Sequence, residues 1–299
     1  MTLRLGGWGS GLLGVIIFSG SLPATRVAVA GFSPMFLTSV RAVIAAALAA
    51  LLLLALRQRR PQRSDIGPLA LVAIGGVIGF PLLTALALQR ITAAHSIVFI
   101  GFLPLATAIF GVLRGGERPR PAFWLFSILG AVAVAGFARY GSEGGTMRGD
   151  LLMIAAILVC GLGYAEGATL SRRLGGWQVI SWALLLSLPV MAAIALASWP
   201  DDLGRVGRPA WIGLAYVSVF SMLVGFVFWY RGLATGGIAR VGQLQLLQPF
   251  FGFLLAAILL GEPIGWTMVA SAAVVVARRG QAERGCRFVS AGVRSARRI

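Results

Sequence analysis

The sequence contains no lysine, a single histidine and only two cysteines among its 299 residues. Without lysine it cannot hold a G-x-x-x-x-G-K-[ST] phosphate-binding loop, which excludes the ATP-driven step that such a loop supports. The H-E-x-x-H and G-x-S-x-G motifs of metal-dependent and serine hydrolases are also absent. Cys160 and Cys286 lack the spacing of metal ligands. We therefore expect no enzyme activity, no bound metal and no other cofactor.

Charged residues are also scarce, and the apolar residues fall in long uninterrupted runs. Only 12% of residues are charged, against about 25% in a typical soluble domain, and the mean hydropathy is +0.89. The stretch from Ala42 to Leu56 is apolar throughout. A helix needs about 20 apolar residues to cross a bilayer, where lipid offers the backbone no hydrogen-bond partner. The sequence predicts an all-α integral membrane protein.

Ten apolar segments joined by short polar connections predict ten transmembrane helices. All basic residues are arginine, and most of them lie on the cytoplasmic side if the N-terminus is placed there. This asymmetry predicts cytoplasmic termini in a plasma or inner membrane. Because the arginines lie in short loops between apolar segments, the net charge of +17 indicates membrane lipid, and not nucleic acid, as the partner. The predicted segments are Ser10–Val29, Met35–Leu56, Ile66–Leu88, Ser96–Leu113, Pro121–Ala138, Leu151–Leu170, Gln178–Ala197, Trp211–Tyr230, Val241–Leu260 and Ile264–Ala277.

One phrase occurs twice, as FLPLATAIFGVLRGGE ending at Glu117 and LLQPFFGFLLAAILLGE ending at Glu262. Pro104 and Pro249 are separated by the same number of residues as the two glutamates. Each copy ends the fourth segment of its half, and an odd number of segments per half reverses the orientation of the second half. The chain is therefore predicted to form two inverted five-helix repeats, residues 8–140 and 150–277. Such repeats underlie alternating access to a site near the bilayer midplane, and the glutamates are expected to be turn and cap residues.

These features resemble the drug/metabolite transporter superfamily, in particular its EamA-type transporters with two five-helix repeats. The resemblance rests on TSVRAVIAAALAALLLLA (38–55), with an arginine in the second helix, and on residues 87–119 and 232–264, which carry the two phrases. It implies a secondary transporter that exports small metabolites or drugs. Residues 278–299 lie outside the resemblance, and we expect them to form a basic cytoplasmic tail to which we assign no function.

Two ionisable residues inside predicted spans are candidates for function, because burying them is costly unless they are paired or hydrated. Arg41 lies in the second span and could bind an anionic group, or tie helices together. Glu166 is the carboxylate within the sixth span, where it could carry a coupling proton or bind a cationic solute group. Its alternative role is an ion pair with Arg172 or Arg173, one and a half to two turns along the helix.

The ninth span adds a polar stripe, because Gln245 and Gln248 are three residues apart and share a helix face, with Gln243 nearby. These amides predict either a hydrated cavity wall or hydrogen bonds between helices. Three prolines, Pro23, Pro104 and Pro249, are expected to kink their helices and to free carbonyl groups that can line a cavity.

Small and aromatic residues predict how the helices pack. The pairs Gly75 and Gly79, Gly163 and Gly167, and Gly232 and Gly236 have the small-xxx-small spacing that lets helices approach closely. Trp229 and Tyr230 are expected in an aromatic belt at the membrane surface, together with Trp8 and Trp211.

The function that fits these observations is export of a small polar solute, amino acid-like or a drug, by alternating access. Glu166 would be the proton or cation site, Gln245 and Gln248 would contact the solute, and proton coupling and a homodimer are left open. Two alternatives remain: an importer or exchanger of a small organic anion, and a membrane scaffold that transports nothing.

Overall fold

The computed structural model describes residues 6–116, 121, 124 and 145–266. All regular secondary structure in these ranges is helical, and eight of the described helices are long and apolar enough to cross a membrane. The predicted fifth and tenth spans fall almost entirely outside the described residues, as do Glu117 and the basic tail. The eight spans are Gly7–Ala28, Pro34–Ala55, Arg63–Leu88, Ala93–Gly115, Met147–Leu174, Gly176–Ala197, Arg208–Gly236 and Ile238–Leu260.

The first four spans are built from several helical pieces. Only the second is a single unbroken α-helix, and it begins where the Ser33 side chain accepts a hydrogen bond from the Phe36 amide. The others change helix type or are interrupted near their middle. The pieces are α1 (Gly7–Ser19), α2 (Ser21–Ala28), α3 (Pro34–Ala55), α4 (Arg63–Val72), the π-helix η1 (Ala73–Gly79), α5 (Phe80–Leu88), α6 (Ala93–Phe99), the 3-10 helix η2 (Ile100–Phe102) and α7 (Leu103–Gly115).

The second four described spans follow the same plan, except that their first helix is continuous. Thr146 caps that helix by accepting a hydrogen bond from the Gly149 amide at 3.1 Å. The pieces are α9 (Met147–Leu174), α10 (Gly176–Ala197), the short 3-10 helix η3 (Leu203–Arg205), α11 (Arg208–Tyr216), the π-helix η4 (Val217–Val224), α12 (Gly225–Gly236), α13 (Ile238–Gly242), the 3-10 helix η5 (Gln243–Leu247) and α14 (Gln248–Leu260).

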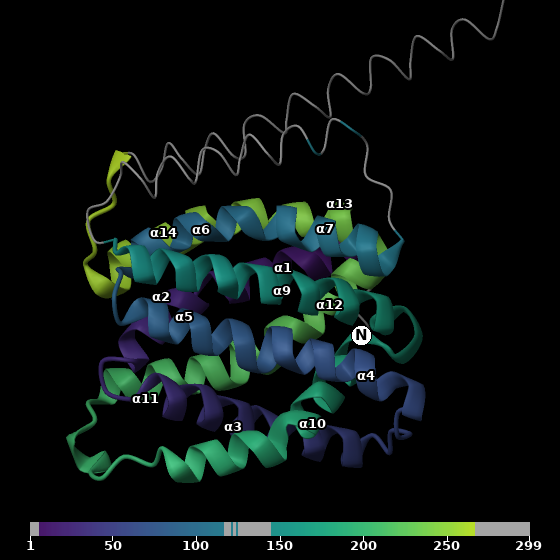
Figure 1. Cartoon of the computed structure of the whole chain (residues 1–299), viewed down its shortest axis with the longest axis horizontal. Helices are drawn as coiled ribbons and strands as arrows, with labels where there is room; N and C mark the ends of the chain where they lie inside the picture. The colour runs from purple at the N-terminus through teal and green to yellow at the C-terminus, as the bar shows by residue number, and fades with distance from the viewer. Residues whose placement is uncertain (1–5, 117–120, 122–123, 125–144, 267–299) are drawn as a thin grey trace, which may run out of the picture.

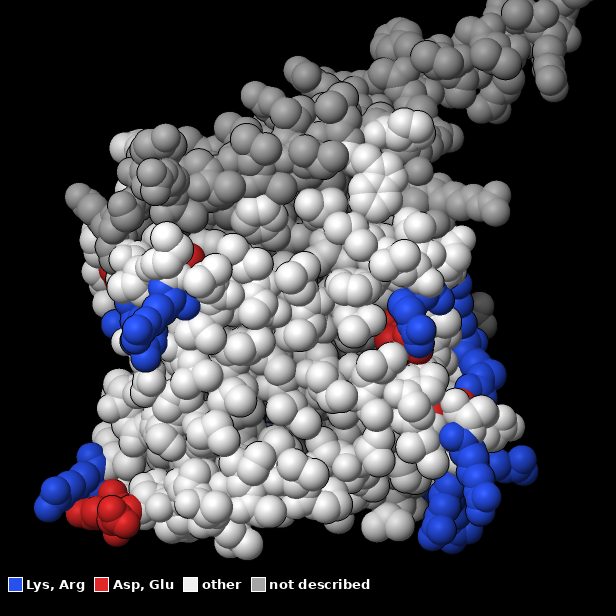
Figure 2. All heavy atoms as spheres, viewed as in Figure 1, with Lys and Arg blue, Asp and Glu red and all other residues white. Residues whose placement is uncertain are grey.

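The helices run nearly parallel to one another across the view, with α6, α7 and α14 at the top, α9 in the middle and α3, α10 and α11 at the bottom (Figure 1). Charged side chains gather at the two ends of these helices, and a broad uncharged band separates them (Figure 2). Leu54, Leu196 and Ile258 are 75%, 74% and 68% exposed. Apolar side chains this exposed fit a lipid-facing surface, as expected for a multi-pass membrane protein.

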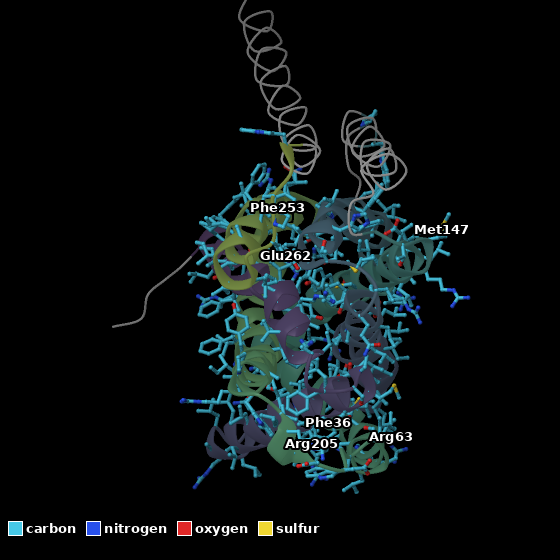
Figure 3. The ribbon with its side chains drawn as sticks, turned by 90° about the vertical axis from the view of Figure 1, so that its left-hand side faces the viewer. Phe36, Arg63, Met147, Arg205, Phe253 and Glu262 are labelled. Carbon is cyan, nitrogen blue, oxygen red and sulfur yellow. The ribbon has the colours of Figure 1, made fainter. Side chains whose placement is uncertain are left out.

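We name the two ends of the bundle after one residue at each. The Asp65 end carries the start of α4, the end of α7 and the end of α9. The Glu262 end carries the end of α2, the start of α6 and the loop with Arg205. Figure 3 looks onto the Glu262 end, where Glu262 and Arg205 are labelled.

Backbone details repeat between the two sets of four spans. The third span of each set contains a π-helix, η1 or η4. The fourth spans match more closely: α7 and α14 each have 13 residues, follow a 3-10 helix and have a proline as second residue. Each also ends at a left-handed glycine, Gly116 with φ 64° and Gly261 with φ 62°, a conformation that glycine adopts without strain.

Glycines bring the two sets into close contact. A Cβ atom added at Gly75 would lie 2.5 Å from the Val159 carbonyl oxygen and 2.7 Å from Gly163 Cα, so η1 and α9 pack backbone against backbone. Gly232 meets Gly11 in the same way, which joins α12 to α1. The predicted close packing at these glycines is confirmed. The first span thus packs on the seventh described span, and the fifth described span packs on the third.

Candidate functional site

The first span is interrupted at Gly20, between α1 and α2. Pro23 is the third residue of α2 and has no N–H to donate to the Ser19 carbonyl, which weakens the helix at this point. The Tyr216 hydroxyl donates a hydrogen bond to the Ile17 carbonyl at 2.7 Å. It leaves no room for a side chain at residue 20, because a Cβ there would lie 2.4 Å from the Tyr216 oxygen. Tyr216 of α11 therefore packs directly against the backbone at the interruption.

Arg41 reaches the same interruption from α3. Its Nη2 atom lies 3.4 Å from the Ser221 hydroxyl of η4, which is 2.6 Å from the Ser21 hydroxyl at the start of α2. Arg41 is only 4% exposed, and its Nε atom has no hydrogen-bond partner among the described residues. A buried guanidinium with hydroxyl partners alone is costly, and an anionic group would stabilise it. Sequence reasoning found Arg41 but missed the two serines, because serine often bonds to its own helix backbone and gives no signal.

Gln243 and Gln245 of the ninth predicted span belong to η5 and Gln248 begins α14, and both elements contact η2 and α1. Gln248 donates from Nε2 to the Phe18 carbonyl, a long contact of 3.4 Å, while its Oε1 has no partner within the described ranges. Gln245 is fully buried, and both its amide atoms lack partners there. Gln243 is half-buried in the same 3-10 helix. Buried amides without partners are rare and cost about 1–3 kcal/mol per group, so these groups are suited to bind a polar solute or water.

Further polar groups around the glutamines escaped the sequence analysis. The Thr107 hydroxyl of α7, the Ser10 hydroxyl of α1 and Trp229 Nε1 of α12 are buried, and the described part of the chain offers them no hydrogen-bond partner. A Cβ atom at Gly242 would lie 3.9 Å from the Thr107 methyl group, which places Thr107 beside the start of η5. We call Arg41, Gln245, Gln248, Thr107, Ser21 and Ser221 the central polar group.

Aromatic side chains form a wall next to this group. Phe18 packs against Phe226 with ring centroids 5.2 Å apart, and Tyr164 packs against Trp229 at 5.5 Å. Trp229 and Tyr230 are fully buried, and the Tyr230 hydroxyl donates to the Gly163 carbonyl at 3.2 Å. The expectation that these two residues belong to a surface belt is wrong, because α12 packs on α1 and α9 through this face. Trp8 and Trp211, by contrast, are 49% and 40% exposed.

Glu166 is engaged elsewhere, in an ion pair with Arg114 of α7. The Arg114 Nε atom lies 2.7 Å from Oε2 of the carboxylate, and the two side chains are 45% and 7% exposed. Arg173, which sequence reasoning considered as a partner, pairs instead with Asp65 at the start of α4. Both ion pairs join α9 to the first set of spans at the Asp65 end. The structure thus brings Arg41 and Gln248 to one interruption and places Glu166 in a contact between α7 and α9.

The Glu262 end is closed by hydrogen bonds to the start of α6. The Glu262 carboxylate accepts from the amides of Ala93 and Ala94 at 3.1 and 2.8 Å. His95 Nε2 lies 2.8 Å from Asp150 Oδ1 of α9, so α6 is tied to two elements of the second set. The prediction that Glu262 caps a helix end is confirmed, although the helix is remote in sequence. His95 is fully buried.

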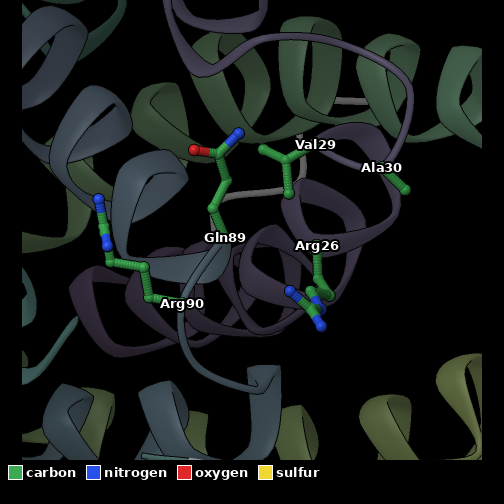
Figure 4. A pocket seen from close by; sticks show the side chains of 5 residues that line it. All are labelled: Arg26, Val29, Ala30, Gln89 and Arg90. Carbon is green, nitrogen blue, oxygen red and sulfur yellow. The ribbon is translucent and has the colours of Figure 1, made fainter. Parts of the chain in front are cut away.

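A cavity of about 610 Å³ also opens at the Glu262 end. Arg26 of α2 and Arg90 after α5 approach it from different segments, with Gln89 between them in the view (Figure 4). Arg26 donates to the Leu88 carbonyl, the last residue of α5. Val29 and Ala30 complete the described lining.

Comparison with known proteins identifies relatives along most of the chain. The sequence model described as the EamA-like transporter family matches residues 6–139 and again residues 147–277. The uncharacterized transporter YdeK of Bacillus subtilis is 64% identical over 90% of this chain and 94% of its own length. A probable terminal-alkyne amino-acid exporter of Streptantibioticus cattleyicolor is 24% identical over 84% of each chain. A protein of known crystal structure, 20% identical, superposes with a TM-score of 0.71 over 95% of this chain and 98% of its own, which shows the shared fold.

Proposed function

The chain belongs to the EamA-like transporter family, and from that premise we propose that it exports a small polar solute, amino acid-like or a drug, by alternating access. The observation that carries this proposal is the central polar group, in which both amide atoms of Gln245 and the Gln248 Oε1 atom are buried without a partner among the described residues. Such groups are costly unless something binds them. A relative named as a probable amino-acid exporter supports the solute class.

The architecture that we propose for this transport has ten spans in two inverted halves, residues 8–140 and 150–277. The two matches of one family model and the repeated backbone of α7 and α14 support it. With both termini in the cytoplasm of a plasma or inner membrane, the Asp65 end faces the cytoplasm and the Glu262 end faces outward. Alternating access then requires each end to open in turn.

Within this proposal the solute lies at the interruption of the first span. Gln245 and Gln248 bind its uncharged polar atoms, and Arg41 binds an anionic group or holds η4 in place. Glu166 is the coupling residue: a proton on its carboxylate would weaken the ion pair with Arg114 and release α7 from α9 at the cytoplasmic end. Charge loss at a contact that closes one end is a direct way to couple protons to opening.

The test is a survey by mass spectrometry of the medium around cells that overproduce the protein. Gln245→Leu, Gln248→Leu and Glu166→Gln are compared with the unchanged protein at equal membrane levels. Gln58→Leu is the matched control, because Gln58 lies at the Asp65 end and contacts Gln178. We expect a compound that accumulates outside with the unchanged protein and with Gln58→Leu, and about tenfold less with either central variant. Equal accumulation in all variants would remove these residues from the mechanism.

A second function, import or exchange of a small organic anion, is favoured by Arg41 and the two arginines of the outer cavity. Counterflow into proteoliposomes loaded with unlabelled organic acid distinguishes it from export. If neither assay shows transport with the protein correctly inserted, the remaining alternative is a membrane scaffold.

A further inference from the structure

The cavity at the Glu262 end is lined by positively charged side chains. Two guanidinium groups and one amide line it, and no carboxylate does so among the described residues. Of the described acids at this end, Asp150, Asp202 and Glu262 are bound to His95, Arg205 and the α6 amides, respectively, and Asp201 is exposed in the loop beside Asp202 and does not line the cavity. The field inside the cavity is therefore positive, and two guanidinium forks are suited to a planar carboxylate.

The side chains of Arg26 and Arg90 are held differently: Arg26 is anchored by a hydrogen bond and Arg90 is exposed. Arg26 is half-buried and anchored by its hydrogen bond to the Leu88 carbonyl, which fixes its direction while other N–H groups remain to donate. The Arg90 side chain is exposed and has no hydrogen bond to any described residue. Because an anchored guanidinium and an exposed one line the same cavity, both can donate to one anion.

The cavity and the central polar group share one helix, α2. Ser21, which bonds to Ser221 beside Arg41, begins that helix, and Arg26 lies five residues later, about 7.5 Å along the axis. Three arginines thus follow one another from the interruption to the outer surface. The volume of about 610 Å³ falls within the range of about 300–1,000 Å³ that is usual for small-ligand sites.

We propose that this outer cavity binds the carboxylate of an organic solute on its way between the central polar group and the outside, so that the transported solute is a carboxylic acid or an amino acid. The inference rests on the proposed function for the direction and the path. The binding itself depends only on Arg26 and Arg90.

The experiment uses purified full-length protein in a maltoside detergent and two fluorinated probes of equal shape, 4-fluorobenzoate and its neutral analogue 4-fluorobenzamide. Binding is read from the fluorine NMR relaxation of each probe. We compare the unchanged protein with Arg26→Gln, Arg90→Gln and the double variant. Arg205→Gln is the matched control, because it removes the same charge at the same end from a residue that does not line the cavity.

We expect the unchanged protein and Arg205→Gln to bind the benzoate and not the amide. Each single variant should weaken benzoate binding about fivefold, and the double variant more than tenfold. The Arg90 side chain is exposed and has no hydrogen bond or ion pair with the described residues, so Arg90→Gln tests the cavity even if Arg26→Gln fails to fold. Equal binding of both probes, or benzoate binding unchanged in Arg90→Gln, overturns the inference.

A lipid phosphate is the competing source of an anion at this depth. Two results together would overturn the inference in favour of a lipid site. Added phosphatidylglycerol would displace the benzoate at an equimolar ratio, and phospholipid would copurify with the unchanged protein but not with the double variant. The export survey separates the two proposals. Probe binding without export by the unchanged protein defeats the proposed function and leaves the anion site standing, whereas export unchanged in the double variant removes the cavity from the path.

Discussion

The contact between Glu262 and the start of α6 provides the sharpest test of how the outer end opens. Replacing Glu262 by alanine removes both acceptors of the Ala93 and Ala94 amides, and replacing it by glutamine leaves one neutral acceptor. A buried hydrogen bond that a carboxylate accepts from an amide at a helix N-terminus stabilises a structure by about 1.5–3 kcal/mol, and Glu262 accepts two such bonds. Glu262 is half-buried, so its rehydration offsets much of this sum. We therefore assign the contact about 2 kcal/mol in total.

At about 1.4 kcal/mol per factor of ten, Glu262→Ala should raise the population with α6 released about thirtyfold, and Glu262→Gln about fivefold. The assay is the rate at which a maleimide labels a cysteine introduced at Ala94, which is 1% exposed. Cys160 and Cys286 are first replaced by alanine. Asp202→Ala is the control, because Asp202 caps a turn of its own loop through the Gly204 amide and joins no helices. Labelling rates of both Glu262 variants within twofold of the parent would refute the reasoning.

Three further predictions concern stability and transport. Gly75→Ala should lower the free energy of unfolding by about 1–3 kcal/mol, because the added methyl group would meet the Val159 carbonyl. Gly67→Ala should leave that free energy unchanged, because nothing lies within 4 Å of the added methyl group. Thermal unfolding in detergent measures both variants. Asp65→Ala should cost about 1–2 kcal/mol, because Asp65 completes the capping box of α4 and binds Arg173, and a melting temperature equal to that of the parent would contradict this. Gln245→Leu should raise the melting temperature while export falls, since it removes two unpaired buried atoms; a fall in both would indicate a structural role.

The sequence predicts where the helices lie because a membrane imposes a minimum apolar length. It places their ends less well. The segment predicted as Leu151–Leu170 is the middle of a helix that runs from Met147 to Leu174, since Thr146 caps it outside the apolar run and Arg172 and Arg173 continue it. Polar residues at the bilayer surface remain helical, so hydropathy marks the part of a helix in lipid and not the whole helix.

Which face of a span meets which neighbour is much harder to predict. Trp229 and Tyr230 end a long apolar segment and precede Arg231, which is the usual sequence position of belt residues, so the sequence does not show that they are buried. The Arg114 partner of Glu166 comes from a helix 52 residues away in sequence, and nothing local indicates it. Gln245 and Gln248 could be predicted from the sequence, because a polar side chain within an apolar span is costly whichever way it faces and therefore indicates a role.

The backbones of α7 and α14 are similar, but the chemistry of the side chains differs between the two sets of spans. At the separation of Pro104 and Pro249, Gln248 corresponds to Leu103, Gln245 to Ile100 and Arg41 to Leu186. A solute bound by the central polar group therefore meets different atoms from each half. The two ends differ as well: arginine–carboxylate pairs, in part exposed, close the Asp65 end, whereas carboxylate–amide bonds and the buried His95–Asp150 contact close the Glu262 end. Salt screens exposed charge pairs strongly and hydrogen bonds to backbone amides weakly. Rising ionic strength should therefore loosen the Asp65 end first, and the two ends of the bundle would then respond unequally to the same solution.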